Sequence, residues 1–323
     1  MSKFFINANF HQLSPSSVHG SSDAAYREYR RKWDTYPSER IVADFPLHLD
    51  IETTCRCNLR CVFCDKQPLL PGGESDLPES VFRKVVDEGS EHGLCSIKLS
   101  YRGEPLLYPK LASLVHYAKK KGVLDVYFNT NGMLLTQAKA VQLVEAGLNR
   151  ISVSIEGTDA KQYEAQRVGA SFDKVRANIE ALVKVRERLG VDYPKIRIQT
   201  VALPWVDLER YSAFWGEIAD EVACLDFNDS LNRTCELVDE NFCCPQIWQR
   251  MTITCEGTIL ACNNDDYQRS AMGSVYDSSI RECWLGGRVR AMRQAHAEGR
   301  SHAPPSCSDC AWRTTQIRKS RQG

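Results

Sequence analysis

The chain has 323 residues, 41 Lys and Arg against 41 Asp and Glu, and a formal net charge of zero. This balance argues against a broad basic surface, so we expect neither nucleic acid nor a membrane as a partner. No apolar run is long enough to span a bilayer, and the start, MSKFFINANF, lacks the pattern of a signal peptide. We therefore expect a cytoplasmic protein whose thiols stay reduced.

The 14 cysteines are many for a protein of this kind. They gather in two places, with Cys55, Cys57, Cys61 and Cys64 near the start and a second group from Cys243 to Cys310. In a reducing compartment, close spacings of this kind favour metal ligation over disulfides. The sequence therefore predicts two metal sites.

The first 45 residues form a polar N-terminal extension interrupted by prolines and a glycine. Within it, residues 23–33 (DAAYREYRRKW) are typical of a short basic helix that begins after Ser22 or Asp23. We expect this helix to lie over one end of the main domain; a substrate-gripping arm is the alternative.

From residue 46 to about 230, strand-like and helix-like segments alternate. The expected strands are 47–54, 96–101, 124–130, 150–155, 195–202 and 222–227, and the expected helices are 79–92, 109–121, 136–146, 172–189 and 208–219. Alternation with helices of this length predicts βα units and a parallel sheet. Because such connections are right-handed, six in series predict an α/β fold of the (β/α)6 partial TIM barrel type, with chemistry on loops after the strands.

The remaining segment, 231–323, loses this alternation. It predicts a hairpin of 251–254 and 258–262 turning at Glu256 and Gly257, followed by helices at 279–284 and 287–298. A unit this small needs a metal to supplement its core.

The segment 57–64, CNLRCVFC, carries cysteines at C-x3-C-x2-C directly after the first expected strand. Three thiolates can ligate three irons of a four-iron cluster and leave the fourth iron open. The segment closely resembles the signature of the radical S-adenosylmethionine (radical SAM) superfamily. That resemblance implies that Cys57, Cys61 and Cys64 hold a [4Fe–4S] cluster whose free iron binds SAM. A zinc knuckle or a ferredoxin-like loop is the alternative, and Cys55 is excluded as a ligand because it would close the open iron.

The resemblance continues on the loops that follow the later strands. Residues 102–105 (RGEP) resemble the family's GGEP motif, with Arg102 in place of its first glycine. The resemblance implies that Glu104 pairs with the SAM ammonium, that Arg167 binds its carboxylate and that Phe63 lies beside adenine. The remaining implied SAM contacts are Gly103, Asn129, Ser152, Ser154, Val201 and Leu203. As alternatives, Glu104 caps a turn, Arg167 forms a surface ion pair, and Val201 and Leu203 belong to the barrel core.

The C-terminal cysteines resemble those of a truncated SPASM, or twitch, domain. The pattern is Cys244, Gly257, Cys262 and then Cys307-x2-Cys310. The resemblance implies a second, auxiliary [4Fe–4S] cluster held by Cys244, Cys262, Cys307 and Cys310; a structural zinc ion on the same four cysteines is the alternative.

These features favour an enzyme that cleaves SAM to a 5′-deoxyadenosyl radical and abstracts a substrate hydrogen atom. We expect a two-electron dehydrogenation of a small polar molecule or short peptide, with the auxiliary cluster as electron acceptor and a flavodoxin or ferredoxin as reductant. Radical epimerisation is one alternative, with Cys235, Cys243 or Cys255 as hydrogen donor. Peptide or protein maturation and a non-catalytic metal protein are the others. Residues 226–229 either contact substrate or form a solvated loop.

Overall fold

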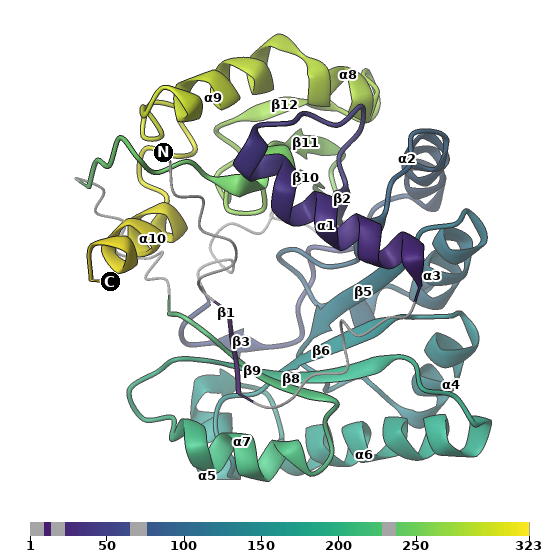
Figure 1. Cartoon of the computed structure of the whole chain (residues 1–323). Helices are drawn as coiled ribbons and strands as arrows, with labels where there is room; N and C mark the ends of the chain where they lie inside the picture. Colours follow the sequence, from purple (N-terminus) through teal and green to yellow (C-terminus); the bar gives the residue numbers. More distant parts are fainter. Residues whose placement is uncertain (1–9, 14–22, 65–75, 228–236, 323) are drawn as a thin grey trace.

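One sheet of ten strands organises the computed structural model, which describes residues 10–13, 23–64, 76–227 and 237–322 (Figure 1). The strand order is β1-β9-β8-β6-β5-β4-β2-β10-β11-β12. The strands are β1 (Phe10–Gln12), β2 (His48–Ile51), β4 (Ser96–Lys98), β5 (Asp125–Thr130), β6 (Arg150–Ser154), β8 (Lys195–Val201), β9 (Glu221–Leu225), β10 (Arg250–Ile253), β11 (Thr258–Leu260) and β12 (Ala271–Ser274). Two short strands, β3 (Arg60–Cys61) and β7 (Arg167–Val168), form a separate pair.

The helices mostly connect successive parallel strands. They are α1 (Ala24–Glu39), α2 (Glu79–Glu91), α3 (Leu111–Lys120), α4 (Gln137–Glu145), α5 (Ala160–Gln166), α6 (Phe172–Leu189), α7 (Leu208–Gly216), α8 (Ile280–Leu285), α9 (Gly287–Ala297) and α10 (Ala311–Gln322). The six expected strands pair in parallel, from β2 through β4, β5, β6 and β8 to β9. The predicted α/β class is therefore confirmed.

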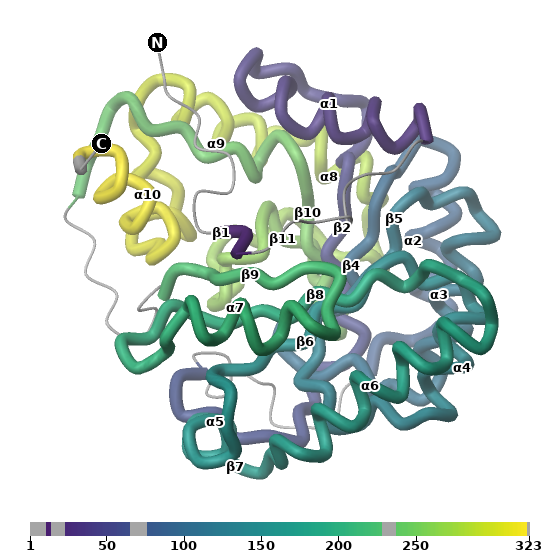
Figure 2. The backbone as a smooth tube through the Cα atoms, turned by 60° about the horizontal axis from the view of Figure 1, so that its bottom comes forward, coloured from purple at the N-terminus to yellow at the C-terminus, as the bar shows by residue number. Residues whose placement is uncertain are grey.

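The two faces of this sheet differ in chemistry because side chains alternate along each strand. One face carries residues such as Ile51, Phe128 and Ile198, which are fully buried in the main hydrophobic core. The other carries buried polar residues such as Asp50 and Ser152. Figure 2 shows helices α3, α4 and α6 outside the strands. The polar face is therefore the inner one.

Helix α1 lies against the start of strand β2, as expected, and ends at Glu39 rather than at Trp33. Asp23 caps its first turn, with its carboxylate accepting from the Ala25 amide at 2.8 Å. The buried Trp33 ring meets His48 edge-on at 5.8 Å between ring centroids. The helix therefore covers the N-terminal end of the strands, opposite the loops on which we expect chemistry.

The sheet does not stop where the barrel was expected to end. Strand β10 pairs in parallel with β2, with Ile253 beside Ile51, and then turns into β11. Gly257 forms this turn with a positive φ of 87°, and a Cβ there would lie 2.6 Å from the Tyr276 ring. The hairpin predicted from the sequence is thus present, but it extends the barrel sheet.

Six of the described helices and strands were not foreseen: β1, which pairs with β9, the paired strands β3 and β7, and β12, α5 and α10. Among the described residues, no helix is long and apolar enough to cross a membrane.

Candidate functional site

The loop after β2 brings three free, half-buried cysteines together: Cys57, Cys61 and Cys64. Cys61 lies on β3, which pairs with β7 and so faces Arg167. Burial raises the pKa of Cys61 to about 11, although the nearby Arg167 cation acts to lower it. A thiol in this environment becomes a stable thiolate when a metal centre supplies positive charge.

Gly103 lies directly against the cysteine loop. A Cβ at this position would lie 2.2 Å from the Thr54 carbonyl oxygen and 2.7 Å from that of Arg56. The next amide, of Glu104, donates to the same Arg56 carbonyl at 2.8 Å. Only glycine allows this approach, so the RGEP loop and the cysteine loop form one backbone unit.

Glu104 is buried and caps the 3₁₀ turn η2 (Pro105–Leu107), as the alternative prediction had it. Its carboxylate accepts from the Leu106 amide at 3.0 Å, the Thr130 hydroxyl at 2.6 Å and the Asn131 amide at 2.8 Å. Burial raises the pKa of Glu104, and these hydrogen bonds oppose the rise. A carboxylate can accept about four hydrogen bonds, so one acceptor position is left for a ligand ammonium.

Asn129, Ser152 and Ser154 lie on the inner face of adjacent strands. Asn129 pairs laterally with Ser152, and Ser154 accepts from the Gln199 amide side chain at 3.3 Å. The buried Ser152 hydroxyl has no hydrogen-bond partner in the described part of the chain. These side chains share the inner face of β5 and β6, and this face includes an unsatisfied hydroxyl.

Arg167 is buried, so the surface ion pair considered for it is wrong. Its guanidinium binds Glu156 through two hydrogen bonds of 2.5 and 2.8 Å and lies 3.8 Å from the Cys61 sulfur. It also lies over the Phe63 ring at 5.4 Å. Glu156 thus fixes Arg167 beside the cysteine loop, where it can meet an anionic ligand group.

The two apolar residues predicted to contact adenine lie at the end of β8. Val201 is the last residue of the strand and half-buried, whereas Leu203 is buried just beyond it. Neither belongs to the main hydrophobic core cluster of described residues. Their position is compatible with a ligand wall, which remains a prediction.

The four C-terminal cysteines converge although they come from three segments. Cys262, Cys307 and Cys310 are buried, Cys244 is half-buried, and none of the four is in a disulfide. Burial raises the pKa of Cys262 well above its usual value, and the charges of Cys307 and Cys310 act in the same direction. The Arg313 amide donates to the Cys310 sulfur at 3.5 Å.

Four cysteine thiols of this kind can hold either a single zinc ion or an iron–sulfur cluster. In the described residues, no three His, Cys, Asp or Glu side chains lie close enough to hold one metal ion. A zinc ion with Zn–S bonds of about 2.3 Å needs closely packed sulfurs. A four-iron cluster gives each iron its own thiolate and spreads the sulfurs apart. The donor set of four cysteines without a histidine is one that a four-iron cluster uses.

The three cysteines predicted as hydrogen donors have different surroundings. Cys235 lies outside the described residues. Cys243 is fully buried in a C-terminal apolar cluster with Ile247 and Trp248. Cys255 is buried at the end of β10, where its amide donates to Glu52 at 3.0 Å. The packing of Cys243 favours a structural role, and Cys255 is the better placed of these two.

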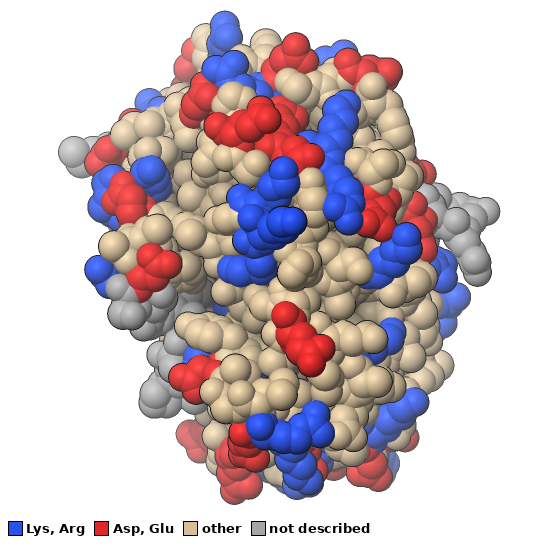
Figure 3. Space-filling model, turned by 90° about the vertical axis from the view of Figure 1, so that its right-hand side faces the viewer, with Lys and Arg blue, Asp and Glu red and all other residues tan. Residues whose placement is uncertain are grey.

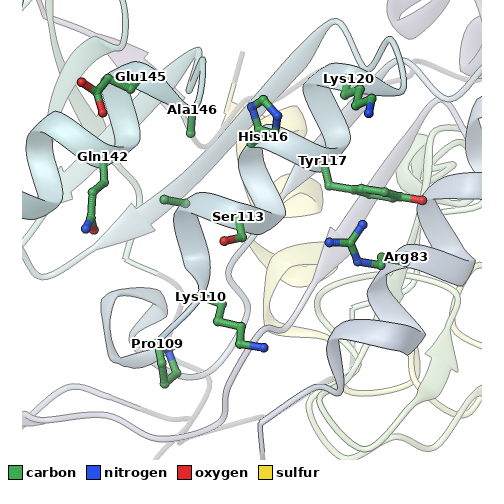
Figure 4. Close-up of a pocket in the computed structure, with 11 residues that line it drawn as sticks. Arg83, Pro109, Lys110, Ser113, His116, Tyr117, Lys120, Gln142, Glu145 and Ala146 are labelled. Carbon is green, nitrogen blue, oxygen red and sulfur yellow. The ribbon is translucent and has the colours of Figure 1, made fainter.

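A groove of about 700 Å³ runs between α2, α3 and α4 (Figure 4). Arg83, which lies 4.1 Å over the Tyr117 ring, and the side chains of His116 and Lys120 line it. None of the predicted site residues lines this groove. On the face of the molecule shown in Figure 3, basic side chains gather near the middle, and acidic side chains lie close to them. The groove is separate from the cysteine site.

Comparison with protein families identifies both regions of the chain. Residues 51–195 match the radical SAM superfamily, and residues 243–311 match the SPASM iron–sulfur cluster-binding domain. The chain belongs to the radical SAM superfamily. Its cofactors are SAM, the SAM-binding [4Fe–4S] cluster and an auxiliary cluster, as the sequence predicted. Iron–sulfur clusters therefore take the place of the zinc sites considered as alternatives for the two cysteine sets.

Curated relatives match this radical SAM protein over part of their length. A probable GTP 3′,8-cyclase of Methanococcus maripaludis is 33% identical over 135 residues, which is 42% of this chain and 45% of the relative. A tungsten-containing aldehyde ferredoxin oxidoreductase cofactor-modifying protein of Pyrococcus furiosus is 32% identical over 48% of this chain and 43% of its own length. The chain thus spans less than half of these relatives.

Solved structures match this radical SAM protein over more of its length than the curated relatives do. BtrN in complex with AdoMet and 2-DOIA has a TM-score of 0.57 at 19% identity, covering 84% of this chain and 93% of BtrN. Native anSMEcpe with bound AdoMet has a TM-score of 0.62 at 15% identity, with coverage of 85% and 95%. At these identities, the likeness concerns the fold alone.

Two buried acids at the site were not among the predicted residues. Glu52 follows Asp50 at the end of β2, and Glu156 follows Ser154 at the end of β6. Each lies two residues beyond an inward-facing residue, so period-two alternation is the signal that locates them.

Proposed function

We propose that this radical SAM protein dehydrogenates a small polar molecule, such as a sugar or an aminocyclitol. When bound, the cofactors supply a 5′-deoxyadenosyl radical that takes one hydrogen atom, and the auxiliary cluster accepts the electron left after a proton is lost. A flavodoxin or ferredoxin is the proposed reductant.

The observation that carries this proposal is the complete cysteine set of the C-terminal domain. Four cysteines converge there, one for each iron of a four-iron cluster. A cluster without an open iron suits electron transfer better than substrate binding. The Tyr101 hydroxyl, two residues before Gly103, donates to Asp266, four residues after Cys262, so the segment after Cys262 contacts the SAM-site loop.

The protein's own residues give the SAM site its shape. Glu104 keeps one acceptor position beside the cysteine loop for an ammonium group, and Arg167 presents a fixed guanidinium for a carboxylate. The Gly103 backbone packs directly against the Thr54 and Arg56 carbonyls at the start of the cysteine loop. The structural neighbour BtrN, solved with AdoMet and 2-DOIA, gives support for the small-molecule class.

Product analysis tests the proposal. Anaerobically reconstituted protein with SAM, dithionite and a panel of aminocyclitols and sugars should yield a product lacking two hydrogens and one 5′-deoxyadenosine per turnover. The Cys310→Ala variant should still cleave SAM but should make little product. Regeneration of SAM, or a product of unchanged mass, would count against dehydrogenation.

The position of Cys255 supports epimerisation as a second candidate. Cys255 is buried beside Glu52 and Arg102 rather than within the described apolar clusters. A thiol there would return a hydrogen atom to the substrate carbon. Deuterium uptake from solvent into a product of unchanged mass formula, abolished by Cys255→Ala, would establish this reaction instead.

A further inference from the structure

A buried ionic contact links the SAM-site loop to the first barrel strand. Arg102 stands immediately before Gly103, and 2% of its side chain is exposed. Its guanidinium binds the Glu52 carboxylate through two hydrogen bonds of 2.9 and 2.7 Å, and its own amide donates to Glu52 at 3.2 Å. Burial alone would lower the pKa of Arg102, but Glu52 outweighs that effect and raises it.

The same carboxylate reaches the C-terminal domain. Glu52 accepts the Cys255 amide at 3.0 Å, at the point where β10 turns toward β11. Glu256, the next residue, lies 3.8 Å from the Arg102 guanidinium. Arg102 and Glu52 therefore hold the start of the hairpin turn that leads to Cys262.

A second contact runs through Tyr101. The Arg102 guanidinium lies 5.5 Å from the centroid of the Tyr101 ring, and the Tyr101 hydroxyl donates to Asp266 at 3.4 Å. Asp266 is buried four residues after Cys262. The segment 101–104 is thus attached to the C-terminal domain on both sides of Cys262.

The arginine itself is the unusual part of this arrangement. The motif that RGEP resembles has glycine at the position of Arg102, so the guanidinium is an addition to the motif. We propose that Arg102 is a positioning residue that fixes the Cys262 loop against the SAM-site loop. The inference rests on the proposed function, because transfer of the second electron requires both loops to face one substrate.

Loss of Arg102 should change the position of the Cys262 loop and leave the capacity to cleave SAM intact. Misplacement by about 1 Å at a reacting site can cost roughly 100-fold in rate. Without Arg102, the C-terminal domain keeps its β2–β10 pairing and the Tyr101–Asp266 contact. It loses the Glu256 contact, and Glu52 loses the partner that fixes its carboxylate against the Cys255 amide. SAM cleavage without substrate should therefore persist while the Cys262 loop becomes looser.

Hydrogen–deuterium exchange on the cluster-loaded protein tests this without any substrate. In Arg102→Met, amides of 254–270 should exchange about tenfold faster, the change that losing roughly 1.4 kcal/mol of local stability gives. The EPR spectrum of the doubly reduced protein should also change, because the spin interaction between two clusters depends on their separation. Tyr101→Phe, which removes only the hydroxyl, should speed exchange near Asp266 alone.

Two further variants separate positioning from stability. Arg102→Met with Glu52→Gln removes both buried charges, so it should recover global stability while exchange at 254–270 stays fast. Arg150→Met breaks an equally buried pair with Asp125, between β5 and β6, and should leave 254–270 unchanged.

The proposal is overturned if Arg102→Met exchanges like wild type at 254–270. It is also overturned if the double variant restores slow exchange there, since Arg102 would then only neutralise Glu52, or if Arg150→Met loosens the same segment. None of these readouts requires dehydrogenation, so failure of the proposed function would be recognised separately.

Discussion

The guanidinium of Arg167 lies 3.8 Å from the sulfur of Cys61 and is held there by the buried Glu156. Strand pairing between β3 and β7 creates this neighbourhood, because Cys61 and Arg167 are partners in register. A residue more than a hundred positions away thus supplies a fixed positive charge to the cysteine loop. This relationship places Arg167 where it can bind the SAM carboxylate, as we propose, in addition to its pairing with Glu156.

Replacing Arg167 with Met should destabilise the protein and weaken SAM binding together. The change leaves the Glu156 carboxylate, 1% exposed, without its partner. Breaking a buried pair on one side costs about 3–5 kcal/mol. Denaturant unfolding and equilibrium SAM binding by the cluster-loaded variant would measure both losses.

Glu156→Gln is the matched control for that variant. It removes the carboxylate but keeps the guanidinium, so SAM binding should fall less than in Arg167→Met. Equal SAM affinities in the two variants would show that Arg167 acts only as the partner of Glu156.

Gly103→Ala should prevent stable assembly of the cysteine loop. The added Cβ meets two backbone carbonyls, of Thr54 and Arg56, which cannot rotate away as a side chain does. We expect a loss of about 1–3 kcal/mol in unfolding free energy, typical of overpacking, and reduced iron content after reconstitution. Gly216→Ala, where a Cβ meets nothing within 4 Å, is the control and should retain iron like wild type. Full iron content in Gly103→Ala would contradict the role of this contact.

Local patterns in the sequence were sufficient to predict most of the barrel. Helix α6 spans the expected residues 172–189. The six parallel strands lie within the expected segments, apart from one residue at the start of β9. These predictions succeed because the hydrophobic pattern of each helix or strand depends only on the residues within it. The cysteine loop was predictable for the same reason. Spacing within one loop is a local property, and it places Cys57, Cys61 and Cys64 together without knowledge of the rest of the chain.

Features that depend on distant segments could not be predicted in this way. The pairing of β2 with β10 joins residues about 200 positions apart, and the sequence of neither strand indicates which strand it pairs with. Strand β1 has three residues, too few for a periodic signal. The partner of Arg102 could not be predicted either, because Glu52, which binds its guanidinium, lies 50 positions earlier in the chain.

Stability should fall when the pH is lowered from about 6.5 to about 4, in part because of His48. Burial lowers the pKa of His48 to about 4, although Asp50 acts in the opposite direction. An unfolded histidine has a pKa near 6.5, so between these values the unfolded chain binds a proton that the folded chain does not. At about 1.4 kcal/mol per pKa unit, the loss attributable to His48 is roughly 3 kcal/mol.

His48→Gln should reduce this slope, whatever its effect at neutral pH. The measurement is urea unfolding of wild type and variant at several pH values in this range. Parallel pH profiles for the two proteins would show that His48 already titrates normally when folded.

Ile253→Ala should weaken the barrel and the C-terminal domain together. Ile253 is fully buried on β10, pairs with Ile51 of the barrel and Ile259 of the hairpin, and belongs to the core that both regions share. Truncating such a side chain costs about 2–5 kcal/mol, whereas Val191→Ala, at an exposed site, should change little. Because one core and one sheet cross the expected boundary near residue 230, exchange protection in β2 and β4 should fall along with that in β10 and β11. If the C-terminal strands lost protection alone, the two regions would be independent folding units despite their common sheet.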